Sequence, residues 1–314
     1  NEIIQLTETL QFTLGESVLE IIYLIASILF VFGLKMLSQP DTARKGNLWA
    51  AFGMLIAIIG TILFYKSGDG EGVKNVLLII VAMIIGTVIG WLIAKKVDMK
   101  AMPQLVSLFN GMGGACIAVI GVMEYTNIDA TAGLHFGEFI SIILGMVIGS
   151  VAFTGSMIAF GKLNGNIGDV RAPVLRYINL LFVLAIVVLI IYDLANPTVM
   201  ASGSLDTTML YILFALALVY GITFVMPIGG ADMPVVISLL NSFTGLAAAF
   251  GGFLYHNQAM LTGGILVGSA GTILTILMCQ AMNRSLFNVI VGAFGGGGAA
   301  AAEGVEGNIK EIST

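Results

Sequence analysis

The chain has 314 residues, of which 58% are hydrophobic and only 10% are charged, whereas about a quarter of an ordinary soluble domain is charged. Thirteen basic and 18 acidic residues cannot cover the surface of a soluble fold of this length. Composition therefore excludes a soluble enzyme and a disordered chain, and it predicts a polytopic membrane protein. The net charge of −5, without a basic stripe, also argues against a nucleic-acid partner.

Apolar stretches long enough to cross a bilayer recur along the chain. A hydrocarbon core of about 30 Å needs about 20 apolar residues in a helix. The stretches that meet this length are 17–37, 48–65, 75–94, 104–123, 136–160, 174–192, 208–227, 234–255 and 260–280. They are continuously apolar rather than alternating, which excludes a β-barrel. We therefore expect an all-α bundle of nine transmembrane helices.

The basic residues predict how these helices are oriented. Eleven of the 13 fall in alternate connections or in the tail: Lys35, Arg44, Lys45, Lys95, Lys96, Lys100, Lys162, Arg171, Arg176, Arg284 and Lys310. The other side of the membrane has only Lys66 and Lys74. Because basic residues stay on the inner side, we expect the N-terminus outside and the C-terminus inside.

The ends of the chain differ from the spans. Residues 1–16 contain three Glu and no Lys or Arg, unlike a signal peptide, and their apolar spacing predicts an interfacial segment. The chain begins with Asn, so we expect it to be processed or excised from something longer. Residues 17–285 are the expected transmembrane domain. Residues 286–314, rich in Gly and Ala, are the expected linker, ending as if a soluble domain had been removed.

Neither a cofactor nor a metal ion is expected in this chain. The tail contains G-x-G-x-x-A, but no strand precedes it and too few residues follow it for a dinucleotide-binding unit. The two cysteines and two histidines are scattered, which argues against a metal site.

Residues 102–114 and 233–245 form an internal repeat. Met, Pro, Ser, Leu, Asn and a final Gly coincide in register, and both copies begin a span at the inner face, so the repeat is parallel. Ser107 and Asn110 in one copy, like Ser238 and Asn241 in the other, lie three residues apart on one helix face. Each Asn lies about 10 Å into the membrane, where an amide needs a partner or a water-filled path.

Two interpretations of the repeat stay open. The amides and hydroxyls can simply join neighbouring helices by hydrogen bonds. Alternatively, the two faces line one polar seam for a proton, which we favour because Ser156 in the fifth span adds a further hydroxyl. The neighbouring Ser150 and Thr154 also add hydroxyls, and each of these three side chains either joins the seam or bonds back to its own helix.

Two acidic residues lie at the ends of these spans. Asp232 directly precedes the eighth span, where it is either a helix cap or a carboxylate at the inner mouth of a pathway. Glu124 ends the fourth span near the outer face, where it is either a proton acceptor or an interfacial residue. Glycine pairs at four-residue spacing predict close helix packing: Gly86/Gly90, Gly145/Gly149 and Gly264/Gly268.

Several ordered motifs resemble the membrane part of the beta subunit of proton-translocating NAD(P) transhydrogenase. They are Gly229-Gly230-Ala231-Asp232-Met233-Pro234-Val235-Val236, Leu240-Asn241-Ser242-Phe243-Thr244-Gly245, Phe153-Thr154-Gly155-Ser156 with Phe160-Gly161-Lys162, and Ala281-Met282-Asn283-Arg284-Ser285. The resemblance covers nearly all of residues 17–294.

The resemblance implies a translocase that couples proton movement to hydride transfer between NAD(H) and NADP(H), which bind in soluble domains absent from this chain. The chain alone is then not expected to transfer hydride. The implied partners are an alpha subunit with its own transmembrane helices and NAD-binding domain, the chain's own NADP-binding domain, a second copy of the complex, and the lipid bilayer. The implied location is the bacterial inner membrane, or alternatively the mitochondrial inner membrane.

By the same resemblance, Asn241 corresponds to an Asn on the proton path, Ser156 to a path-lining serine, and Asp232 to the Asp at the inner mouth. Arg284 corresponds to an Arg in contact with the NADP domain. Many family members have His where this chain has Asn110, and Asn cannot titrate. The protonated group is then Glu124 or a His on an alpha-subunit helix.

Two other classes of function stay open. A parallel repeat is compatible with a stand-alone secondary transporter, although the sequence shows no charged pocket of substrate size. The chain is also compatible with a structural anchor for an inner soluble domain, in which case replacing Asn110, Asn241 and Glu124 by neutral residues would leave activity unchanged.

Overall fold

The structure is a computed structural model that describes residues 2–65, 72–126, 136–168, 170, 174–195, 207–229, 232–283 and 286. Its α-helices are α1 (Glu2–Leu37), α2 (Pro40–Phe64), α3 (Val76–Lys96), α4 (Met102–Thr126), α5 (Phe136–Leu163), α6 (Val174–Ala195), α8 (Thr207–Val225), α9 (Met233–Leu254) and α10 (Gln258–Ala281). A short 3₁₀ turn, η1 (Met99–Ala101), leads into α4.

The nine predicted spans are confirmed within the described ranges, because nine helices there are long and apolar enough to cross a membrane. One difference is at α2, which begins at Pro40 instead of residue 48. Proline favours the first turn of a helix, where its missing N–H is not needed. The polar residues after it therefore coil as the start of α2, and the turn between α1 and α2 shortens to Ser38 and Gln39.

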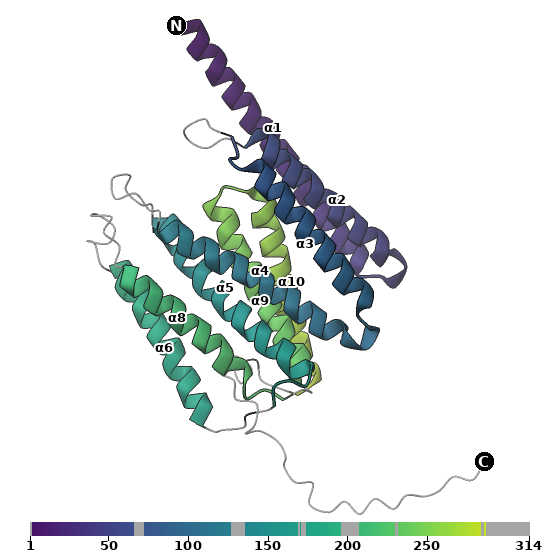
Figure 1. The fold of residues 1–314 in the computed structure, drawn as a ribbon, viewed down its shortest axis with the longest axis vertical. Coiled ribbons are helices and arrows are strands. Elements are labelled where there is room, and N and C mark those ends of the chain that lie inside the picture. The colour runs from purple at the N-terminus through teal and green to yellow at the C-terminus, as the bar shows by residue number, and fades with distance from the viewer. Residues whose placement is uncertain are drawn as a thin grey trace, which may run out of the picture.

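Apart from α3, the helices form three groups (Figure 1). The antiparallel pair α1 and α2 lies on one side and touches the rest through α10. The central group contains α4, α5, α9 and α10, in which α4 packs on α5, α9 packs on α10, and α5 and α4 both contact α9. On the other side α8 packs on α5, and α6 packs on α8. Consequently α5 is the helix around which the centre is built.

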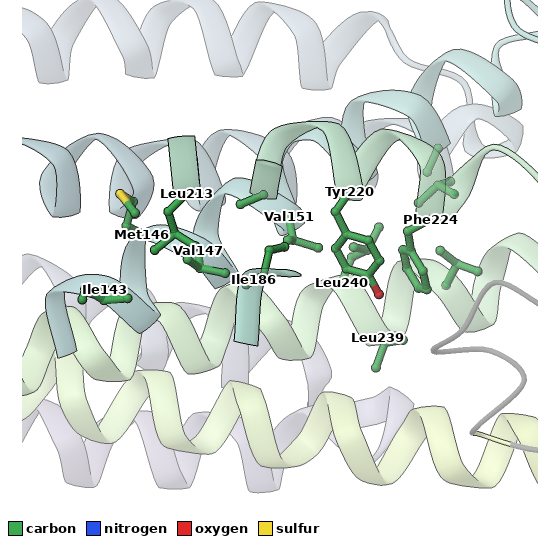
Figure 2. Packing of buried hydrophobic residues seen from close by; sticks show 14 of the residues in the cluster. Ile143, Met146, Val147, Val151, Ile186, Leu213, Tyr220, Phe224, Leu239 and Leu240 are labelled. Carbon is green, nitrogen blue, oxygen red and sulfur yellow. The ribbon is translucent and has the colours of Figure 1, made fainter. Parts of the chain in front are cut away.

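The main apolar core lies where α5, α6, α8 and α9 meet (Figure 2). Ile143 and Met146 of α5, Leu213 of α8 and Leu240 of α9 are at most 1% exposed. These side chains interdigitate between helices that are apolar on nearly every face. Burial at this centre fixes α5 against α8 and α9, and this packing positions the polar groups described below.

Close helix packing is confirmed for two of the three predicted glycine pairs. A Cβ atom added to Gly149 of α5 would lie 2.8 Å from the Gly114 carbonyl of α4, and one added to Gly264 of α10 would collide with the backbone of Ala249 in α9. For the third pair the prediction is wrong within the described chain, because a Cβ atom added to Gly86 or Gly90 of α3 would have no neighbouring atom within 4 Å. Small residues permit close approach but do not specify a partner.

The N-terminal segment is continuous with the first span. Helix α1 has 36 residues, about 54 Å at 1.5 Å per residue, and its first turns project beyond the neighbouring helices (Figure 1). Residues 2–16 therefore do not form a helix separate from the first span. Their interfacial position stays a prediction.

Candidate functional site

Three of the predicted site residues meet between α4 and α5. The Ser107 hydroxyl donates to the Ser156 carbonyl at 2.8 Å, and Asn110 Nδ2 donates to Ser156 Oγ at 2.9 Å. Ser107 and Ser156 are 1% exposed and Asn110 is 8% exposed. These are buried polar groups in a segment apolar enough to span a membrane, and they are satisfied by one another.

The close approach of α4 and α5 makes this cluster possible. A Cβ atom on Gly111 would lie 3.1 Å from the Ser156 Cβ, and one on Gly114 would lie 2.8 Å from the Gly149 carbonyl. Larger residues at Gly111 and Gly114 would separate the two helices. The cluster therefore depends on glycines in the same Asn-Gly-Met-Gly-Gly segment of α4 that supplies the amide.

Helix α9 reaches the cluster through a residue that we did not predict as part of the site. Thr244 Oγ1 donates to the Leu240 carbonyl at 3.1 Å and also approaches the Asn110 carbonyl at 3.5 Å. Asn241 lies one turn before Thr244 and is half-buried. It forms no side-chain hydrogen bond with the part of the chain that the structure describes. Within the described residues, its whole amide is thus available to another group, whereas the Asn110 amide has one donor engaged by Ser156.

The two Ser-x-x-Asn pairs face different helices. Ser238 of α9 donates to the Gly271 carbonyl of α10 at 3.2 Å, just as Ser107 of α4 donates to a carbonyl of α5. Ser242, next to Asn241, donates to the Gly268 carbonyl of α10 at 2.7 Å. The repeat is therefore one packing unit used twice, in which a helix binds its successor through a serine. Ser238 does not join the Asn110 cluster.

Asp232 occupies the N-cap position of α9, and its side chain makes no capping hydrogen bond. It is 9% exposed. Its backbone N–H bonds the Gly229 carbonyl at 3.0 Å, which holds the tight turn before the helix. Asp232 therefore has the position of a helix cap, but its side chain does not form the capping hydrogen bond. The positive end of α9 still favours a negative charge at this position.

Glu124 is paired at the opposite end of the central group. The Tyr255 hydroxyl, just after α9, donates to Glu124 Oε1 at 2.6 Å. Burial raises the pKa of the Tyr255 phenol, and the hydrogen bond and the negative charge of Glu124 raise it further. Tyr255 is therefore a neutral donor at physiological pH, and it joins the last turn of α4 to the end of α9.

This pairing predicts an alkaline loss of stability. We expect Tyr255→Phe to lower the free energy of unfolding by about 1 kcal/mol at neutral pH, the usual net value of one hydrogen bond. Because the pKa of Tyr255 is raised in the folded state, the stabilisation is complete below about pH 10 and is lost as the pH rises above it. Thermal unfolding of both proteins between pH 7 and pH 11 measures the difference. Tyr177→Phe, which removes an exposed phenol of α6, is the control, and a difference that does not shrink with pH would contradict the assignment.

The other predictions concern Ser150, Thr154, Arg284 and a metal site. Ser150 and Thr154 donate to the carbonyls four residues before them, at 2.6 and 3.1 Å, so for these two residues the back-bonding alternative holds. Arg284 lies outside the described residues. Within the described ranges no group of three or more His, Cys, Asp and Glu side chains could hold a metal ion.

The described residues therefore define an all-α polytopic membrane protein with polar groups buried among its central helices. A family model described as NAD(P) transhydrogenase beta subunit matches residues 19–314. Two curated relatives, both called NAD(P) transhydrogenase subunit beta, are from Rhodospirillum rubrum and from a named strain of that species. Each is 40% identical over 294 residues, which is 91% of this chain and 60% of the relative. The chain belongs to the NAD(P) transhydrogenase beta-subunit family, and it spans about 60% of the length of these relatives.

Proposed function

We propose that this chain is the proton-translocating membrane domain of an NAD(P) transhydrogenase. In this proposal, proton movement is coupled to hydride transfer between NAD(H) and NADP(H), which bind in soluble domains outside this chain. The observation that carries the proposal is the buried Asn110–Ser156 pair at the contact of α4 and α5, with Asn241 nearby on α9. Buried, hydrogen-bonded polar groups within spans are typical of proton and ion pathways.

The acidic residues are placed where the ends of such a path are needed. Asp232 lies nine residues before Asn241 on α9, about 14 Å along the helix, and Glu124 lies 14 residues after Asn110 on α4, about 21 Å along it. With the N-terminus outside and the C-terminus inside, as the basic residues predict, Asp232 is at the inner mouth and Glu124 at the outer one. Arg284 and Asp232 then face the NADP-binding domain, which follows on the inner side.

Among the described residues, the side chains that we assign to the centre of this path are amides and hydroxyls. Asn110 and Asn241 can orient water or a partner but cannot carry the proton themselves. Glu124 is one candidate for the protonated group. The other is a His from a transmembrane helix of the alpha subunit, placed against the free hydrogen-bonding capacity of Asn241. Such a helix makes the alpha subunit part of the path. We further propose that the complete assembly is a dimer in a bacterial inner membrane.

Liposomes distinguish this function from a stand-alone transporter. We expect the complete complex to change the interior pH only while both nucleotides are being converted, because proton access alternates with the state of the NADP domain. We expect the present chain alone to transfer no hydride and to take up no solute. Substrate-dependent uptake by the chain alone, measured with the same vesicles, would contradict the proposal.

A further inference from the structure

Lys162 lies in the last turn of α5, and its ammonium group binds the connection between α8 and α9. Its Nζ donates to the Met226 carbonyl at 2.5 Å and to the Ile228 carbonyl at 2.9 Å. Both carbonyls lie beyond the end of α8 at Val225, where a cation also interacts favourably with the negative end of the helix. The Lys162 side chain of α5 thus binds two backbone carbonyls in the connection between α8 and α9.

The segment held by Lys162 leads directly to Asp232. Ile228 and Met233, on either side of the Gly229–Asp232 turn, are 0% exposed. The Asp232 N–H binds the Gly229 carbonyl within the same turn. Since protein interiors are close-packed, Ile228 and Met233 cannot move without moving the side chains that they contact. The Ile228 carbonyl that Lys162 binds lies four residues before Asp232 in the chain.

In the other direction, Lys162 is rigidly connected to the buried polar cluster. Ser156, which accepts the hydrogen bond from Asn110, lies six residues earlier on the same uninterrupted helix, about 9 Å away along its axis. The end of α5 is also tied to α4, because Gln104 Nε2 donates to the Leu163 carbonyl at 2.7 Å. The inner end of α5 therefore joins the Asp232 turn to both helices of the cluster.

We propose that Lys162 is a positioning residue that couples the Asp232 turn to the Asn110–Ser156 pair. A displacement of the turn pulls on the two carbonyls held by the ammonium, and α5 carries that displacement to Ser156. An exposed lysine would not do this, and an apolar side chain of equal length would fill the space without holding the turn. This inference rests on the proposed function, in which the state of the NADP domain reaches the membrane domain through Asp232.

The test compares Lys162→Met with Lys162→Arg in the complete complex in liposomes. The measured quantity is the ratio of hydride-transfer rates with and without an imposed pH difference. We expect Lys162→Met to lower this ratio about tenfold, and Lys162→Arg, which keeps the charge and the donors, to retain most of it. Lys96→Met is the matched control: it makes the same substitution at an exposed lysine at the end of α3, and we expect an unchanged ratio.

Each outcome is decisive. A native ratio for Lys162→Met overturns the inference, and so does an equal loss of both rates with an unchanged ratio, because that is the result of a purely structural contact. If Lys162→Met does not assemble, Lys162→Gln, which keeps a single donor group, is measured instead. We expect it to lower the ratio as Lys162→Met would, and a native ratio overturns the inference. If Asn241→Ala also leaves proton coupling intact, the proposed function itself fails; if Asn241→Ala abolishes coupling while Lys162→Met does not, only this inference fails.

Discussion

Replacing Asn241 by alanine is expected to lower proton-coupled hydride transfer by the complete complex about tenfold or more. Asn241 is half-buried on α9, between Thr244, which reaches α4, and Ser238, which binds α10. Among the described residues its amide has no hydrogen-bond partner, so alanine at this position breaks no hydrogen bond within the described part of the chain. A large effect on activity would therefore come from the path and not from the fold.

Two controls make the Asn241→Ala measurement specific. Hydride exchange between the isolated soluble domains is expected to be unchanged, because those domains do not contain α9. Asn47→Ala removes an exposed amide from α2 and is expected to leave proton coupling at its native value. Native coupling in Asn241→Ala would agree with the structural-anchor alternative and would contradict the proposed path.

Gly245→Val is expected to lower the free energy of unfolding by about 3 kcal/mol or more. Gly245 of α9 faces Gly268 of α10, and a Cβ atom there would collide with the Gly268 backbone N and lie 2.9 Å from its Cα. Both obstacles are backbone atoms, so no side chain can rotate away to make room. The two helices would have to separate, which would also break the Ser242–Gly268 and Ser238–Gly271 hydrogen bonds.

Gly86→Val is the matched substitution on α3. Gly86 has no atom within 4 Å beyond its own helix neighbourhood in the described structure, and we expect its thermal midpoint to change little. The midpoints of the two variants and the native protein, measured in the same lipid or detergent, test the prediction. An equally stable Gly245→Val protein would show that α9 and α10 are not packed as described.

The number of helices was predictable because a bilayer imposes one length on every apolar span. Helix ends were less predictable. The first turns of α2 are polar, and hydropathy places them in a loop, whereas Pro40 begins the helix there. Glycine spacing identified close packing for α5 and α10 but also at Gly86 and Gly90, where the described chain supplies no partner.

The candidate site was only partly predictable, because the sequence does not say which helix a polar face meets. The spacing of Ser107 and Asn110 indicated one shared face, and Ser156 was identified as a further hydroxyl, but their contact requires the α4–α5 packing. Ser238 was expected beside them and instead binds α10. Neither Thr244 nor Tyr255 was predicted as a site residue, although Thr244 lies one turn after Asn241 in the same motif and Tyr255 follows the end of α9.

The most direct test of the central claim is the number of protons moved per hydride transferred, measured in vesicles that contain the native complete complex. We predict a fixed, nonzero ratio that falls toward zero in Asn241→Ala. Hydride transfer at the native rate without any accompanying proton movement would contradict the assignment of this chain as the proton-translocating domain.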